Sequence, residues 1–357
     1  MHSHRSWAEI NPAALRHNLG VVREKVGPTA DIMAVVKAHA YGHDVELVVP
    51  AIRELVQMFA VANVTEAKEL RTLCAHEILI LGPALPEERP EIVAAGFMPV
   101  ISSLGEAHAY AALGRTRAHL VVDTGMGRIG VWQDDFEREV EKILRVKNLE
   151  IVGIATHLPV PDEDVEFTQA QLERFQSLVE KHQIPTVNAL NSAGILRFPQ
   201  FAGGMVRAGL MIYGSSPLHE FQPLLQPVMT WKTRVVMVRD VGEGRSISYG
   251  RTFITPGPMR VATLAAGYAD GYHRTLSNRG ASVLIRGQRC PLLGRVTMDQ
   301  IMVDVSGLSE VELGDEAVLV GRQGDEEILA GELAQLAGTI AWEIMTSVSR
   351  RVPRITG

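Results

Sequence analysis

The sequence has 357 residues, of which 46% are hydrophobic and 21% charged, values that suit a soluble globular protein of about two domains. Its 35 Lys and Arg face 41 Asp and Glu. The resulting net charge of −6 argues against a protein that binds nucleic acid by neutralising phosphates, and the apolar content argues against an acidic disordered chain. The two cysteines, Cys74 and Cys290, are too few for a disulfide framework or a cysteine-built zinc site, and favour a reducing compartment.

The start of the chain lacks the apolar core of a signal peptide. No apolar run approaches the roughly 20 residues that a membrane span requires. We therefore expect a cytoplasmic protein that has no membrane partner.

Eight short runs of β-branched and apolar residues recur in the first two thirds of the chain, and helix-like segments separate them. The runs are apolar on both faces, which is typical of buried parallel strands. Eight such repeats fit a (β/α)8 TIM-like barrel better than an open doubly wound sheet, because no glycine-rich phosphate turn follows the first run. The runs are Asp31–Ala38, Phe59–Val64, Ile78–Gly82, Met98–Ser102, Ala118–Asp123, Ile151–His157, Pro185–Asn191 and Met205–Gly214.

Helix signals lie between these runs. Asn11 is a candidate N-cap followed by Pro12, and Ser103 with Glu106 has capping-box spacing. The stretch Gln171–Lys181 places apolar residues on one helical face.

The pattern changes near residues 222–223. Longer alternating runs follow, such as Met229–Val238, with glycine- and proline-containing turns between them and one helix expected at Ile328–Ala337. We therefore predict an α/β + β fold, in which a barrel over residues 1–225 precedes a mainly antiparallel β domain over residues 226–357. We expect the first ~10 residues to pack with the second domain.

Polar and ionisable residues follow several of the predicted barrel strands. Chemistry on such a barrel is placed at the carboxyl ends of the strands, so these residues should gather at one rim. Each alone is more often a solvated charge or a turn residue, and only their joint placement indicates a site. They are Lys37, Asp123–Arg128, His157, Asn191–Ser192 and Arg207.

A metal site is not expected. His39 and His43 are four residues apart, but their segment reads as a loop and no third ligand lies near them in the sequence.

Eight blocks of sequence carry a recognisable series of motifs. They are Val35–His43, Asp123–Gly130, Asn191–Gly194, Val206–Gly214, Ser248–Phe253, Gly267–Tyr272, Met298–Asp304 and Arg351–Arg354. In this order they resemble motifs of the alanine racemase family. The resemblance extends over nearly the whole chain, and the family architecture is a barrel that binds pyridoxal 5′-phosphate (PLP) followed by a β domain.

The resemblance implies racemisation of L- and D-alanine by two bases on opposite faces of the substrate. Lys37 matches the lysine that carries PLP as a Schiff base and then acts as one base. Tyr268 matches the other base, which in the family comes from the second subunit of a homodimer with shared active sites. Arg207 matches the residue that faces the PLP ring nitrogen, and a group with donors only leaves that nitrogen unprotonated, which favours racemisation over transamination. His157 matches the residue that links Arg207 to Tyr268.

The remaining site residues also follow from the resemblance. Arg128 and the Met298 amide match substrate carboxylate contacts, and Asp299 matches a residue at the substrate entrance that the partner subunit supplies. The residues matched to cofactor binding, besides Lys37 and Arg207, are Tyr41, Asn191, Ser192, Gly209, Leu210 and Trp342.

Three positions depart from the family pattern. Val121 replaces a carbamylated lysine that often holds the equivalent of Arg128, Asn188 replaces a histidine, and Trp342 replaces a phosphate-binding tyrosine. These departures keep open a related racemase with serine or broader specificity. A PLP carrier without catalysis is disfavoured by the second domain, and a PLP decarboxylase is disfavoured by Arg207.

Overall fold

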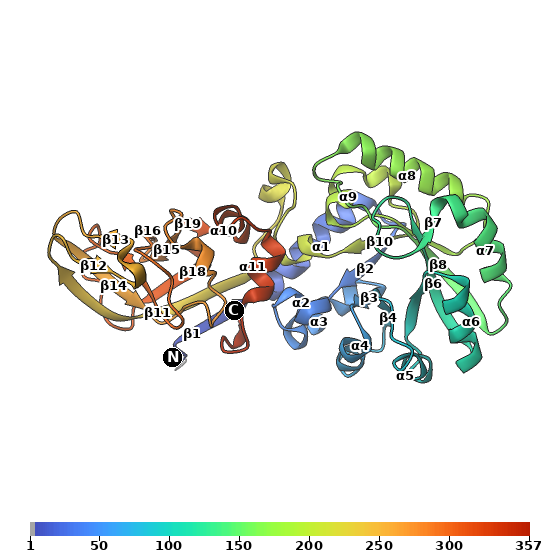
Figure 1. Cartoon of the computed structure of the whole chain (residues 1–357), viewed down its shortest axis with the longest axis horizontal. Coiled ribbons are helices and arrows are strands. Elements are labelled where there is room, and N and C mark those ends of the chain that lie inside the picture. Colours follow the sequence, from blue (N-terminus) through green and yellow to red (C-terminus); the bar gives the residue numbers. More distant parts are fainter. Residues whose placement is uncertain (1–3) are drawn as a thin grey trace. The chain divides into compact units, whose positions relative to one another are not determined.

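A computed structural model describes residues 4–357, which divide into two compact units (Figure 1). The barrel unit consists of residues 15–40 and 48–226. The sheet unit consists of residues 4–14, 41–47 and 227–357. The short segment 41–47, which follows the first barrel strand, therefore belongs to the sheet unit, although it lies between two parts of the barrel unit in the sequence.

Eight parallel strands form the barrel, as predicted. Their order is β10-β2-β3-β4-β5-β6-β8-β9, with the two-residue strand β7 (Val131–Trp132) beside β6. The N–H of Arg207 in β10 donates to the Leu190 carbonyl just after β9, which brings the two ends of the sheet together. The strands are β2 Asp31–Val35, β3 Met58–Val61, β4 Glu77–Ile80, β5 Met98–Ile101, β6 Thr116–Asp123, β8 Leu149–Ala155, β9 Thr186–Asn188 and β10 Met205–Ala208.

The barrel strands are apolar on both faces because both faces are covered. All four residues of β3 are buried, for example, and so are all four of β5. The first run is shorter than predicted: β2 ends at Val35, because the backbone from Ala38 onward turns into left-handed φ values that no strand can contain.

Helices surround the strands on the outside of the barrel (Figure 1). Helix α1 (Pro12–Val26) begins after Asn11, whose Oδ1 accepts hydrogen bonds from the N–H groups of Ala13 and Ala14, as the capping signal predicted. Helix α8 (Val165–Val179) begins earlier than predicted, with Asp164 as its N-cap. The others are α3 Val45–Ile52, α4 Val64–Arg71, α5 Arg89–Ala94, α6 Leu104–Leu113, α7 Phe136–Leu144 and α9 Ser192–Arg197.

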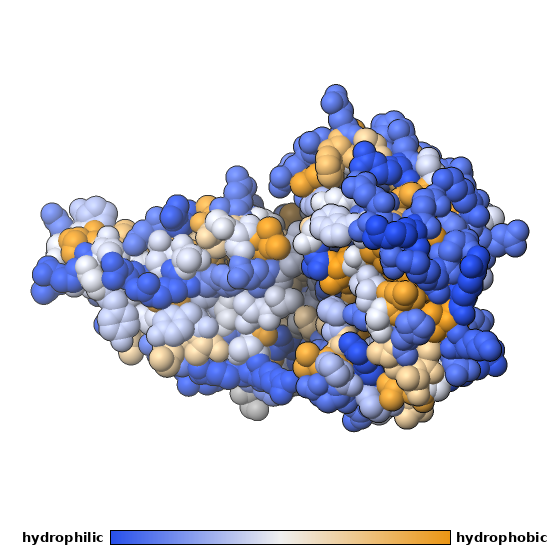
Figure 2. Space-filling view, turned by 45° about the vertical axis from the view of Figure 1, so that its right-hand side comes forward, coloured by the Kyte–Doolittle hydropathy of each residue, from blue (hydrophilic) through white to orange (hydrophobic). Residues whose placement is uncertain are grey.

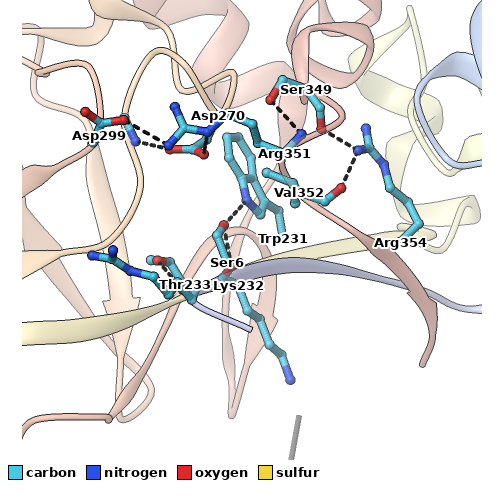
Figure 3. Close-up of polar contacts among 12 residues, drawn as sticks. Ser6, Trp231, Lys232, Thr233, Asp270, Asp299, Ser349, Arg351, Val352 and Arg354 are labelled. Carbon is cyan, nitrogen blue, oxygen red and sulfur yellow. Dashed lines mark hydrogen bonds and ion pairs between the residues drawn. The ribbon is translucent and has the colours of Figure 1, made fainter. Parts of the chain in front are cut away.

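The sheet unit is built around the long strand β11 (Met229–Val241), which pairs with β1 (Ser6–Ile10), β14 and β18, all antiparallel. Buried Trp231 of β11 donates from its indole N–H to the Ser6 hydroxyl at 2.8 Å, and this hydroxyl donates to the Lys232 carbonyl at 3.0 Å (Figure 3). The other strands are β12 Ser246–Ile247, β13 Phe253–Ile254, β14 Met259–Leu264, β15 Ser282–Ile285, β16 Gln288–Pro291, β17 Ile301–Asp304, β18 Glu316–Gln323, β19 Glu326–Ile328 and β20 Arg354–Thr356.

Two late helices lie between β19 and β20, where the sequence predicted one. Helix α10 (Ala330–Ala337) agrees with the prediction and ends at Gly338, whose φ of 75° is the left-handed conformation that glycine favours at a helix end. Helix α11 (Ala341–Ser347) begins three residues later. It was not predicted, because a seven-residue helix spans only two turns and leaves little periodicity to read.

The surface face in Figure 2 is largely hydrophilic, with hydrophobic residues in scattered patches. Within residues 4–357, no helix is both long and apolar enough to cross a bilayer.

Candidate functional site

Lys37 follows β2 and begins a turn of unusual backbone geometry. The next four residues, Ala38 to Tyr41, have φ values of 52° to 55°, so the short segment α2 (Lys37–Tyr41) is a left-handed turn. Such a conformation costs about 1–2 kcal/mol for each residue with a Cβ atom. Strain of this kind persists only where neighbouring groups hold the backbone, and it is concentrated at functional sites.

Glu66 is one of the groups that hold this turn. Its carboxylate accepts hydrogen bonds from the Ala38 N–H at 2.9 Å and from the Ala62 N–H at 2.8 Å. Its own N–H donates to the side chain of Asn63, the N-cap of α4. The start of α4 is therefore tied to the backbone that directly follows Lys37.

The surroundings of Lys37 favour an uncharged amine. Burial lowers the pKa of Lys37 from its usual value of 10.5, and the positive charges of Arg128 and Arg207 lower it further. The Glu66 carboxylate acts in the opposite direction. A neutral amine is the nucleophilic form of lysine, which is the form that attacks a carbonyl group.

Arg207 lies buried in β10 at the centre of a hydrogen-bond network. Nη1 donates to the backbone carbonyl of Asn188 at 3.0 Å and also to its side-chain oxygen. Nη2 donates to the carbonyls of Thr156 and Ala189 and lies 3.2 Å from Nδ1 of His157. The Arg207 Nε–H has no acceptor within residues 4–357, so it remains available to a ligand.

Two histidines next to this arginine are held neutral. Burial, followed by the charge of Arg207, lowers the pKa of His157 to about 3 and that of His119 to about 4. The His119 ring packs against Gly153, where a Cβ atom would lie 2.4 Å from the imidazole, so this position requires glycine. The side-chain amide of Asn188 lies 3.4 Å from Nδ1 of His119.

A group of hydrogen-bond donors lies where β9 and β10 lead into short helices. The Ser192 hydroxyl accepts hydrogen bonds from the N–H groups of Gly209 and Met211, each at 3.3 Å. The Leu210 N–H has no acceptor in the described part of the chain. Asn191 caps α9, accepting from the Gly194 N–H at 3.1 Å. Donors at two adjacent helix starts suit an anion such as a phosphate group.

The loop after β6 carries Arg128. Buried Asp123 accepts hydrogen bonds from four successive N–H groups, those of residues 125 to 128, and thereby fixes the loop. Val121 is buried next to Gly130, and the exposed guanidinium of Arg128 has no side-chain acceptor within residues 4–357. The lysine that would hold this arginine in the family has no substitute among these residues.

The similarity to known proteins extends over both units. Residues 10–217 match the profile of the alanine racemase N-terminal domain, and residues 228–356 match that of the alanine racemase C-terminal domain. The chain belongs to the alanine racemase family. The alanine racemase of Carboxydothermus hydrogenoformans is 43% identical to it over 98% of each chain. That of Symbiobacterium thermophilum is 42% identical over 99% of this chain and 97% of the relative.

Solved structures of alanine racemases have the same fold. The Bacillus anthracis enzyme with bound L-Ala-P has a TM-score of 0.90 and 34% identity, over 100% of this chain and 96% of that one. The Bartonella henselae enzyme with covalently bound pyridoxal phosphate has a TM-score of 0.90 and 28% identity, over 99% of this chain and all of that one.

The residues that the family resemblance singles out are divided between the two units. Lys37, Arg128, His157, Asn191, Ser192, Arg207, Gly209 and Leu210 belong to the barrel unit, where the structure gathers them at the carboxyl ends of the strands. Tyr41, Tyr268, Met298, Asp299 and Trp342 belong to the sheet unit. Burial raises the pKa of Tyr41 to about 12, so its hydroxyl stays a donor, whereas Tyr268 is 42% exposed.

The barrel residues fit PLP as a ligand. A lysine with a lowered pKa suits an aldehyde, the free Arg207 Nε–H suits a pyridine nitrogen, and the donors around Ser192 suit a phosphate. Within residues 4–357, no group of three or more His, Cys, Asp or Glu is arranged to hold a metal ion.

Sequence reasoning missed several residues that support the site. Glu66 had a readable signal, because Asn63 and Glu66 have capping-box spacing. Gln171 had no such signal in the sequence. Its side-chain amide donates to the Thr124 hydroxyl at 2.8 Å and to the His157 carbonyl at 2.9 Å, and both partners are distant from it in the sequence. Arg351 and Arg354 belong to one sequence motif, but their roles also depend on contacts with residues that are distant in the sequence.

Proposed function

We propose that this protein interconverts L- and D-alanine with PLP as its cofactor. The observation that carries the proposal is Lys37, an amine of lowered pKa on a strained turn at the carboxyl end of a barrel strand, beside a buried arginine with one free donor. Membership of the alanine racemase family, and the PLP bound covalently in the Bartonella henselae relative, support it.

Lys37 would hold PLP through its amine and afterwards accept or return a proton on one face of the substrate. When bound, PLP makes the α-hydrogen of an amino acid acidic by spreading the resulting negative charge into its ring. A lysine amine with a lowered pKa is neutral in more of the molecules at neutral pH, which suits a base.

Arg207 would donate from Nε to the ring nitrogen of PLP. Since an arginine only donates, it would leave that nitrogen without a proton and limit how long negative charge stays on the ring. The hydrogen bonds from Nη1 and Nη2 to Asn188, Thr156, Ala189 and His157 would hold the guanidinium in one orientation.

The phosphate of PLP would bind at the helix starts around Ser192. The donors there are the hydroxyl of Ser192 and the N–H groups of Gly209 and Leu210, with Asn191 fixing the start of α9. We assign Tyr41 and Trp342 to the same group through the resemblance, with the Trp342 indole N–H in place of a tyrosine hydroxyl.

Tyr268 of a second copy of the chain would serve as the base on the opposite face. In this proposal the protein is a homodimer with shared active sites, in which the partner also supplies the Met298 N–H for the substrate carboxylate and Asp299 at the entrance. Arg128 would contact the carboxylate from the barrel. The large exposed fractions of Tyr268 and Met298, 42% and 52%, leave both side chains accessible to another chain.

The test combines spectroscopy with a racemisation assay. Purified protein with PLP should absorb in the visible as a lysine-bound PLP does, and should convert either enantiomer of alanine into the other. Tyr268→Phe should remove most racemisation while the absorbance stays. A protein that is inert with alanine when loaded with PLP contradicts the proposal, and full racemisation in Tyr268→Phe contradicts the two-base assignment.

A second candidate is a racemase for serine or a broader set of amino acids. The observations that favour it are Val121, Asn188 and Trp342, which replace family residues close to the substrate and cofactor positions. Values of kcat/KM for alanine, serine and larger amino acids distinguish the two candidates, because even one extra substituent in a tight pocket changes the rate by about tenfold or more.

A further inference from the structure

We propose that Arg351 is a positioning residue that holds the loop of Tyr268 and the loop of Met298 in one arrangement. Its guanidinium joins the carboxylates of Asp270 and Asp299, one from each loop (Figure 3). The inference rests on the proposed function, because it concerns the residue proposed there as the second base.

The two loops already touch through their backbones. The Tyr268 N–H donates to the Thr297 carbonyl and the Ala269 N–H donates to the Met298 carbonyl, both at 3.0 Å. A Cβ atom on Gly267 would lie 2.4 Å from the carbonyl oxygens of Thr297 and Met298, so the close approach requires glycine here. The positions of Tyr268 and Met298 are therefore coupled.

Arg351 reaches both loops from the end of the chain. Nη2 donates to Oδ1 of Asp299 at 2.9 Å, and Nε lies 3.4 Å from Oδ1 of Asp270. Asp270 is two residues after Tyr268, and Asp299 is one residue after Met298. A single side chain thus connects the two short loops.

Asp270 is the more deeply buried of the two carboxylates, so it depends more on a positively charged partner. Its side chain is only 8% exposed, compared with 57% for Asp299. Oδ2 accepts a hydrogen bond from the Gly267 N–H at 2.9 Å, within the loop that carries Tyr268, and Oδ1 faces Arg351. A buried carboxylate needs a positive partner, and Arg351 is the one cation within residues 4–357 that forms an ion pair with Asp270.

Packing alone does not fix the Tyr268 ring. The side chain is 42% exposed, so the direction of its hydroxyl depends on the backbone that carries it. A displacement of about 1 Å at a reacting group can cost about 100-fold in rate. The loop backbone, and hence the arginine that holds it, is the feature that decides where this hydroxyl lies.

A positioning role and a purely structural role predict different results. Arg351 is 53% exposed, but its loss leaves the buried Asp270 carboxylate without its ion-pair partner, so either role predicts a lower Tm. If Arg351 positions Tyr268, the same loss should strongly lower kcat. A large loss of kcat in protein that is still folded and loaded with PLP at the assay temperature is therefore the expected signature.

The experiment uses the PLP-loaded full chain with Arg351→Ala, Arg351→Lys and, as matched control, Arg350→Ala at the exposed neighbouring arginine. We expect kcat to fall about 10- to 100-fold in Arg351→Ala. PLP absorbance at the assay temperature should be nearly unchanged, Arg351→Lys should recover part of the activity, and Arg350→Ala should resemble the unmodified protein. In D2O, exchange of the α-hydrogen should fall for one enantiomer of alanine and persist for the other, because only one base is displaced.

Equal loss of exchange for both enantiomers, unchanged kcat in Arg351→Ala, or the same loss in Arg350→Ala would overturn the inference. Asp299→Asn, at an exposed site, provides a milder second variant, which should lower kcat and reduce α-hydrogen exchange of the same enantiomer. A Tyr268→Phe background separates the two proposals. If Tyr268→Phe removes most racemisation and Arg351→Ala does not lower the residual rate further, both stand. If Tyr268→Phe is fully active, the proposed second base is wrong irrespective of Arg351.

Discussion

Oε1 of Glu66 accepts a hydrogen bond from the backbone N–H of Ala38 at 2.9 Å. Ala38 is the first residue of the left-handed turn that follows Lys37, and the other carboxylate oxygen holds the Ala62 N–H at the start of α4. One side chain thus joins a strained backbone to a regular helix. The strain after Lys37 is sustained partly by this acidic residue, to which the family motif gave no role.

Replacing Glu66 with Ala should therefore destabilise the protein and alter Lys37. Two backbone N–H groups lose their acceptor, and we expect the free energy of unfolding to fall by about 1–3 kcal/mol in urea. The pKa of Lys37 should fall further, because the Glu66 charge raises it. The pH dependence of the rate at which the protein binds PLP measures that shift. Glu87→Ala, at an exposed glutamate of the barrel unit, is the control, and an equal effect there would contradict the role of Glu66.

The amide of Asn188 should be required for the buried Arg207. Its side-chain oxygen accepts from Nη1 of Arg207, and its nitrogen faces His119 and the Ile154 carbonyl. Asn188→Leu removes this acceptor from a buried cation, so we expect a loss of about 1–3 kcal/mol in urea unfolding. The exposed Gln169→Leu should change stability by less than about 0.5 kcal/mol. Similar losses of stability in Asn188→Leu and Gln169→Leu would contradict the requirement for the Asn188 amide.

The buried His119 should make stability depend on pH in the acidic range. Its folded-state pKa of about 4 lies below its ordinary value of 6.5, so between these pH values the folded protein binds fewer protons than the unfolded chain. Stability is therefore present above pH 6.5 and is lost as the pH falls toward 4. The loss is at most about 1.4 kcal/mol for each pH unit.

Urea unfolding at pH 7.5 and pH 5.5 checks this expectation. Between these values, His119→Gln should lose less stability than the unmodified protein, by about 1 kcal/mol. His157, whose pKa is lowered in the same direction, keeps part of the dependence in both proteins. His108→Gln, at an exposed position, should leave the difference unchanged. An undiminished loss in His119→Gln would refute the assignment.

Arg354 should be essential to the sheet unit. Its Nε donates to the Gly42 carbonyl at 2.8 Å, and Nη2 donates to the Val348 carbonyl. Nη1 donates to the carbonyls of Ser349 and Val352 (Figure 3). Burial lowers the pKa of Arg354, as expected for a cation removed from water.

Arg354→Ala leaves four carbonyl groups without their donor. We expect a loss of about 2–4 kcal/mol in thermal or urea unfolding. Arg350→Ala, four residues earlier and exposed, should remain near the stability of the unmodified protein. Equal stability of the two variants would show that the Arg354 contacts contribute little.

The sequence predicted the fold wherever short-range pattern decides structure. Eight apolar runs predicted eight barrel strands, and Asn11 and Ser103 predicted two helix starts at the correct residues. The extent of the first run was wrong, because apolar character does not reveal that Ala38 and its neighbours take a left-handed conformation. Glu66 and Asn63 help to hold this left-handed conformation, and they lie 25 or more residues after Ala38 in the sequence.

The part of the candidate site that could be predicted is the part that lies in strand-end positions and family motifs. Lys37, His157 and Arg207 follow from the strand ends and the family pattern, and the structure gathers them in one unit. The supporting contacts did not follow, since Gln171 reaches Thr124 across 47 positions and Arg351 reaches Asp299 across 52. Contacts between residues so far apart produce no pattern in the local sequence around either residue, so they cannot be predicted from it.

The place of β1 has a consequence for the newly made chain. This strand lies between β11 and β20 and pairs with them at the far end of the sequence; Ser6 and Lys232 are 226 positions apart. At ribosomal rates of about 5–20 residues per second, β1 waits on the order of 10–45 seconds for its first partner. Both of its edges stay unpaired while the barrel strands emerge and pair with their neighbours. Among the strands of residues 4–357, β1 is thus made before the barrel strands and is one of the last to pair, and a chaperone that covers it during synthesis would act on residues 6–10.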